Sequence, residues 1–85
     1  MSNHQITLIG RGGCHLCDDA RAVVFAVLDE LSDVPGSRTI IEVSIDDDDD
    51  LRAAYWDQIP VVLIDGQVHN FWNIDAQRLK SALVG

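Results

Sequence analysis

The stretch 5–17 reads QITLIGRGGCHLC, and it decides the fold that we predict for this 85-residue chain. Its first five residues mix β-branched and apolar side chains, which predicts a strand ending at Gly10. Beyond the stretch, apolar residues recur every three or four positions, as on one face of an α-helix: Leu16, Ala20, Val23, Val27 and Leu31. The cysteines Cys14 and Cys17 therefore fall at the junction between a strand and the helix that follows it.

Outward from this junction, the second half of the chain first predicts another strand and another helix. Residues 39–45 are β-branched and alternate, which predicts a strand inside a sheet. Residues 46–50 are five consecutive aspartates, and helical spacing follows them at Leu51, Ala54 and Tyr55. Because aspartate caps helix N-termini and complements the helix dipole, we interpret the acidic run as a cap. A surface for basic partners is the alternative.

The last third of the chain predicts a hairpin and a final helix. Residues 60–64 form a third apolar strand, Asp65 and Gly66 form a two-residue turn, and residues 67–70 return as a fourth strand. We expect Asn73 to cap a helix with Ala76, Leu79, Ala82 and Leu83 on one side. The sequence thus predicts a single α/β domain over residues 1–85, in the order βαβαββα.

Composition and charge exclude several classes of function. Hydrophobic residues make up 47% of the chain, which suits a globular domain, and no apolar stretch reaches the roughly 20 residues that cross a bilayer. The net charge of −8 repels nucleic acids and anionic membranes. The N-terminus has no signal-peptide pattern. We therefore expect a cytoplasmic protein that binds neither nucleic acid nor membrane.

The cysteine pair is the chemical centre of the sequence. A cysteine at a helix N-terminus is favoured as a thiolate by unpaired N–H groups and the helix dipole, and a second cysteine lies one turn further on. Such a pair can exchange with a substrate disulfide, so we expect Cys14 to attack and Cys17 to resolve the mixed disulfide. Gly12 and Gly13 permit a tight turn beside the sulfur and a close approach of another backbone.

Other interpretations of the pair compete with this one. The two cysteines could be buried structural thiols, although the strand–helix junction favours redox chemistry. A zinc site needs two further ligands, and in the absence of a second cysteine pair we expect no metal unless two chains share an ion. Arg11 and a protonated His15 would lower the pKa of Cys14, whereas Asp18 and Asp19 would raise it. His15 could equally be a plain solvent-facing residue.

The dipeptide Ile59-Pro60, at the start of the third strand, gives the cysteine motif a wider context. Proline cannot donate to a sheet ladder, so its place there indicates an edge or a special turn. Together with the cysteine motif it resembles the thioredoxin-fold superfamily, in which a cis-proline before the third strand faces the dithiol. The short chain and the segment Gly10 to Cys17 are similar to glutaredoxins. Three further segments together resemble a subgroup of short glutaredoxin-like proteins: Val43-x-Ile45-Asp46, Ile59-Pro60-Val61-Val62 and Phe71-Trp72-x-Ile74-Asp75.

The resemblance implies a fold and a set of site residues. The fold is a four-stranded mixed sheet, flanked by helices, whose first two strands are parallel and last two antiparallel. The residues implied in substrate docking are Arg11, Gly13, His15, Ile59, Pro60 and Trp72, beside the catalytic Cys14 and Cys17. Trp72 could instead be a core aromatic that packs the last helix.

Two departures from the glutaredoxin pattern bear on glutathione. His15-Leu16 replaces the usual Pro-Tyr between the cysteines, and residues 70–73, NFWN, replace the glycine pair that helps bind the γ-glutamyl group. We therefore expect no bound cofactor, weak use of glutathione as reductant, and reduction by a dithiol reductase partner.

The leading hypothesis is a thiol–disulfide oxidoreductase in electron transport, acting on a disulfide-containing protein or small molecule. The alternative is a redox-sensing or binding module of the same fold, with a metal shared between chains as one form of it.

Overall fold

The computed structural model describes residues 2–84, and its elements follow the predicted order. They are β1 (Ser2–Gly10), α1 (His15–Glu30), β2 (Gly36–Ser44), α2 (Asp49–Tyr55), β3 (Val61–Ile64), β4 (Gln67–Phe71) and α3 (Ala76–Leu83). Within residues 2–84, no helix is long and apolar enough to cross a bilayer.

The four strands form one mixed sheet in the order β2-β1-β3-β4. β1 pairs in parallel with β2 and antiparallel with β3, which pairs antiparallel with β4. This confirms the predicted α/β class and thioredoxin-like topology. The prediction that residues 39–45 lie inside the sheet was wrong, because β2 is an edge strand and Ile41 is 45% exposed.

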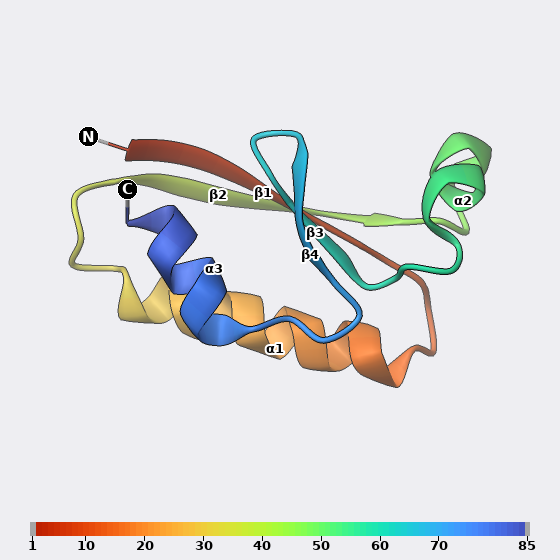
Figure 1. Ribbon diagram of the computed structural model, residues 1–85, viewed down its shortest axis with the longest axis horizontal. Coiled ribbons are helices and arrows are strands. Elements are labelled where there is room, and N and C mark those ends of the chain that lie inside the picture. Colours follow the sequence, from red (N-terminus) through yellow and green to blue (C-terminus); the bar gives the residue numbers. More distant parts are fainter. Residues whose placement is uncertain (1, 85) are drawn as a thin grey trace.

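Helices α1 and α3 pack side by side against one face of the sheet (Figure 1). The core between these helices and the sheet consists of Ile6, Leu8, Ala20, Val24, Val27, Leu31, Val62, Leu79 and Leu83. The predicted helix face is shifted by one position at its start, because Cys17 is buried there and Leu16 is 49% exposed. The helix therefore turns its second cysteine, and not Leu16, towards the sheet.

The other face of the sheet is covered mainly at one end, where α2 lies (Figure 1). A second cluster of Ile9, Ile45, Val61 and Leu63 is buried there, with Leu51 and Tyr55 of α2 packed against it. Because α2 has only seven residues, it leaves Ile41 and Val68 exposed.

Aspartates begin the two short helices, as their hydrogen bonds show. The Asp48 carboxylate accepts from the N–H groups of Asp50 and Leu51, which confirms that the acidic run caps α2. Asp75 caps α3 by accepting from the N–H groups of Gln77 and Arg78. The prediction of Asn73 as this cap was wrong, because the helix begins two residues later.

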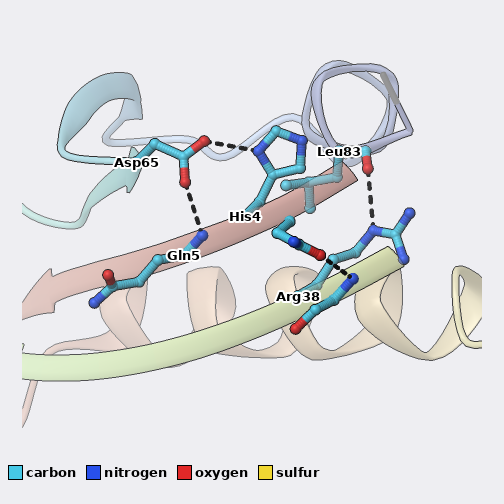
Figure 2. Close-up of polar contacts among 7 residues, drawn as sticks. His4, Gln5, Arg38, Asp65 and Leu83 are labelled. Atoms are coloured by element: carbon cyan, nitrogen blue, oxygen red, sulfur yellow. Dashed lines mark hydrogen bonds and ion pairs between the residues drawn. The ribbon is translucent and has the colours of Figure 1, made fainter. Parts of the chain in front are cut away.

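Polar contacts tie the strands together at the end of the sheet where β1 begins (Figure 2). Asp65, in the turn before β4, accepts from the Gln5 N–H at 2.9 Å and contacts the His4 ring at 2.8 Å. The Gln5 N–H and then His4 lower the pKa of the Asp65 carboxyl. Arg38 donates to the Leu83 carbonyl at 3.0 Å and so holds the end of α3 against β2. These contacts lie at the opposite end of β1 from the cysteines.

Candidate functional site

The sheet topology gathers the predicted site residues at one end. β1 and β2 finish at this end, β3 starts there, and β4, antiparallel to β3, returns to it. The cysteines follow β1, the acidic run follows β2, Pro60 precedes β3 and Trp72 follows β4. Residues up to 58 positions apart in the sequence are thus brought to one edge.

Cys14 is the N-cap residue of α1, as the sequence predicts. Its backbone is extended, with φ −106° and ψ 115°, and its carbonyl accepts the first helical hydrogen bond from the Asp18 N–H at 3.1 Å. The Cys14 Sγ accepts from the Cys17 N–H at 3.2 Å. The sulfur therefore occupies the position that a serine or aspartate oxygen holds in an ordinary cap.

This position favours the thiolate of Cys14. Burial alone would raise its pKa, but hydrogen bonds from Cys17, the charge of Arg11 and the Leu16 N–H together lower the pKa below that of an ordinary thiol. Cys14 is also only partly buried. Both conditions for a reactive cysteine are met at Cys14.

Cys17 has the opposite character. Its side chain is 4% exposed, and burial raises its pKa to about 11, helped by its hydrogen bond with Cys14 and the charge of Cys14. The Arg11 N–H partly opposes this rise. One turn of helix therefore holds an acidic thiol near the surface and a shielded thiol beneath it.

We expect alkylation of the reduced protein to label Cys14 before Cys17. Because the pKa of Cys14 is lowered, its labelling rate should reach a plateau at lower pH than that of a free thiol, whereas Cys17 should gain thiolate only towards pH 11. Peptide mapping after brief iodoacetamide treatment between pH 6 and 10 measures this order. The urea-unfolded protein is the control, in which both cysteines should react alike. Faster labelling of Cys17 would reverse the assigned roles.

Gly10, the last residue of β1, makes room for the buried sulfur, a role that the sequence did not indicate. A Cβ at Gly10 would lie 3.0 Å from the Cys17 Sγ and 3.2 Å from the Cys17 Cβ. Such contacts are tighter than ordinary van der Waals packing. The missing side chain of Gly10 thus lets α1 bring Cys17 down onto the end of the strand.

Gly10→Ala should therefore destabilise the fold by about 1–3 kcal/mol, the usual cost of overpacking a core. Gly12→Ala is the matched control, because a Cβ at Gly12 meets nothing within 4 Å. Urea unfolding of the two reduced variants measures the difference. Equal stabilities would show that Cys17 moves aside without cost.

Of the other residues implied near the dithiol, Arg11 is the one with an electrostatic link to both sulfurs. Gly13 adopts φ +69°, which confirms that a glycine serves the turn into the helix. His15 is exposed in the first turn of α1. Arg11 and Cys17 also line a cavity of about 480 Å³ that continues to Glu42 and Asp47. Both charge signs therefore line the space beside the buried cysteine.

The Ile59-Pro60 bond is cis, as the resemblance implies. Pro60 is buried. The register between β1 and β3 pairs Ile9 with Val61, so continuing it by one residue places Pro60 beside Gly10. Since the Cys17 side chain fills the space beside Gly10, the proline and the dithiol share one corner of the sheet. The Ile59 side chain packs against the cluster under α2.

Trp72 is 56% exposed, which excludes the alternative that it is a core aromatic. Its N–H donates to the Pro60 carbonyl at 2.9 Å, its Nε1 donates to the Asp57 carbonyl at 2.9 Å, and its ring meets Phe71 edge-on at 5.0 Å. Its backbone φ is +63°, a left-handed conformation that costs a bulky residue roughly 1–2 kcal/mol. The sequence did not predict this conformation, nor the neighbouring roles of Phe71 and Asp57.

The fold and the dithiol corner define the class of thioredoxin-like proteins, and the comparisons with known proteins agree. The family model described as "Glutaredoxin-like domain (DUF836)" matches residues 5–84. The chain therefore belongs to this glutaredoxin-like family.

Its relatives come from several bacteria. The chain is 32% identical to the uncharacterized protein Rv0508 of Mycobacterium tuberculosis, over 95% of this chain and 84% of that protein. The X-ray structure of protein XcR50 from X. campestris is 33% identical, with a TM-score of 0.69 over 92% of this chain and 93% of that one. Protein Ne2328 from Nitrosomonas europaea, at 21% identity and a TM-score of 0.74 over 98% and 94% of the two chains, shares the fold.

Proposed function

We propose that this chain is a thiol–disulfide oxidoreductase that reduces disulfides through Cys14 and Cys17 in the cytoplasm. The observation that carries the proposal is the contrast between the two thiols. Cys14 caps α1 with a lowered pKa, and Cys17 is buried one turn away with a pKa of about 11. Membership of a glutaredoxin-like family supports the same chemistry.

In the first step the Cys14 thiolate attacks one sulfur of the substrate disulfide. The substrate S–S bond breaks, a bond forms between Cys14 Sγ and that sulfur, and the other substrate sulfur leaves as a thiolate that takes up a proton. The Cys17 N–H, which lies 3.2 Å from the Cys14 Sγ, stabilises the thiolate before it attacks.

In the second step Cys17 loses its proton and attacks Cys14. The mixed disulfide breaks, the Cys14–Cys17 disulfide forms, and the second substrate sulfur is released as a thiol. The charge and hydrogen bond of Cys14 both help raise the pKa of Cys17 in the reduced pair. Once Cys14 is bonded to the substrate these two causes are removed, so the pKa of Cys17 should fall when it must react. Two electrons pass to the substrate, and a dithiol protein restores the pair.

A coupled turnover assay tests the proposal. The substrate is an uncharged disulfide peptide, and the readout is the oxidation of NADPH. Two donor systems are compared. One is thioredoxin reductase, with or without thioredoxin, and the other is glutathione with glutathione reductase. We expect turnover with the dithiol donor and much less with glutathione. No turnover with any donor would contradict the proposal, and efficient turnover with glutathione would overturn the choice of donor.

A further inference from the structure

Three aromatic residues form an exposed surface at the dithiol end of the sheet. Trp56, at the end of α2, is 65% exposed, Trp72 is 56% exposed and Phe71 is 40% exposed. The Trp72 indole is hydrogen-bonded to the Asp57 carbonyl and meets the Phe71 ring edge-on, so the loop after α2 and the end of β4 are joined. We call Trp56, Phe71 and Trp72 the aromatic surface.

The backbone holds the aromatic surface next to the dithiol corner. The Trp72 N–H donates to the Pro60 carbonyl. Pro60 lies beside Gly10 when the strand register is continued by one residue, and the Cys17 side chain fills the space beside Gly10. A partner whose disulfide reaches Cys14 therefore meets these rings on the same end of the molecule.

The exposure of Trp72 requires an explanation beyond folding. Its φ of +63° is a conformation that favours glycine, and yet a tryptophan with more than half of its side chain in solvent stands there. A strained position that carries an exposed large side chain points to binding, because stability would favour glycine at that backbone and a polar residue at that exposure.

The charge around the aromatic surface selects its partner. Nine carboxylates and three guanidinium groups lie in the segments at this end, so most of the net charge of −8 is concentrated here. The carboxylates belong to Asp18, Asp19, Glu42, Asp46, Asp47, Asp48, Asp49, Asp50 and Asp57. Two of the three cations are already in ion pairs, Arg21 with Glu42 and Arg52 with Asp46. Lysine and arginine side chains are attracted both by such a field and by the faces of exposed tryptophan rings.

Resting on the proposed function, we propose that the aromatic surface docks a basic polypeptide segment, so that the substrate is a protein whose disulfide is flanked by lysine or arginine. Cationic side chains of the segment lie over the indole rings of Trp56 and Trp72. The acidic end of the molecule draws the segment in.

The test uses three disulfide peptides that differ only in their flanking residues, which are lysine, serine or glutamate. With a small dithiol as donor, we expect kcat/KM to be about tenfold higher for the lysine peptide than for the glutamate peptide at low salt. The ratio should fall towards one in 0.5 M salt, where the Debye length is only a few ångströms (~3 Å at 1 M). Equal rates for the lysine and glutamate peptides, or a faster rate for the glutamate peptide, would overturn the inference. Turnover of the serine peptide would in that case still support the proposed function.

Variants separate the rings from the general charge. Trp72→Gly should lower the ratio of kcat/KM for the lysine peptide to that for the glutamate peptide about two- to fivefold, since it removes one cation–π partner. Phe25→Ala is the matched control, because Phe25 is 46% exposed in the middle of α1 and lies outside the aromatic surface. Asp57→Asn removes one negative charge next to the aromatic surface and should weaken the preference for the lysine peptide. Asp29→Asn removes the same charge at the far end of α1 and should weaken that preference less. An unchanged preference in Trp72→Gly would overturn the assignment of the rings.

A binding measurement needs no turnover. A cysteine-free lysine peptide, titrated into the reduced protein, should change the tryptophan emission, and a glutamate peptide should not. A change on raising the protein concentration alone would show that a second copy of the chain covers the surface, and the inference would fall. If no peptide is reduced but the lysine peptide still binds, the proposed function fails and the docking surface stands.

Discussion

Cys14→Ser should lose all catalytic reduction of disulfides, and Cys17→Ser should accumulate a mixed disulfide on Cys14. The physical reason is that Cys14 alone combines a lowered pKa with access to solvent, whereas Cys17 is buried and protonated. Incubation with a disulfide peptide and intact-mass analysis measures the adduct on each variant. Serine keeps the cap hydrogen bond at position 14, so urea unfolding serves as the control that both variants remain folded.

The outcome for the two variants must be asymmetric. An adduct on Cys17 in Cys14→Ser, at a rate equal to that of Cys17→Ser, would show that burial does not protect the second thiol. The assignment of attacking and resolving cysteine would then be wrong.

The double variant Phe71→Gly/Trp72→Gly should gain glutathione-dependent turnover by about tenfold, equivalent to ~1.4 kcal/mol of transition-state stabilisation. The resemblance to glutaredoxins implies that glycines in this segment let the γ-glutamyl group approach the backbone. Phe71 and Trp72 place bulk there, and Trp72 already has the φ of +63° that suits glycine. Glycine also relieves the strain at this residue, which should offset part of the stability lost with the contact between the two rings.

The assay couples glutathione and glutathione reductase to reduction of a small disulfide. Phe25→Ala controls for the loss of an exposed aromatic elsewhere. Efficient turnover of the unsubstituted protein, or no gain in the double variant, would show that the aromatic rings are not what limits glutathione.

Local signals in the sequence predicted most of the fold. The turn at Asp65 and Gly66 has positive φ at both residues, 53° and 84°, as a two-residue hairpin requires. Cys14 caps α1, and the acidic run caps α2. These features depend on neighbours within a few positions, and a sequence pattern records them directly.

The errors concern packing between segments. The stripe with Leu16 and the observed stripe with Cys17 share Ala20, Val27 and Leu31, so the spacing alone could not tell which residue begins the buried face. The edge position of β2 depends on the order of strands, which no local pattern in residues 39–45 specifies. Before α3, both Asn73 and Asp75 are residue types that cap helices. The sequence does not say at which residue the helix begins, and the structure shows that it begins after Asp75.

Which residues meet at the dithiol corner could be predicted from the sequence only in part. The cysteine pair, the arginine before it and the proline before the third strand are local patterns in the sequence. In the structure the charge of Arg11 acts on both thiols, and Pro60 lies beside Gly10 when the strand register is continued by one residue. The need for a glycine at position 10 could not be predicted in this way, because it depends on where α1 places Cys17 against the end of β1. The left-handed backbone of Trp72 likewise depends on the end of the β3–β4 pairing.

A single-turnover experiment decides whether Cys14 and Cys17 exchange two electrons with a substrate disulfide. The fully reduced protein, freed of reductant, is mixed with an equimolar uncharged disulfide peptide, and the products are quantified by mass spectrometry with peptide mapping. We expect one reduced peptide per protein chain and a disulfide that joins Cys14 to Cys17 within that chain. A peptide that stays oxidised, or a disulfide that joins two protein chains, would contradict this exchange.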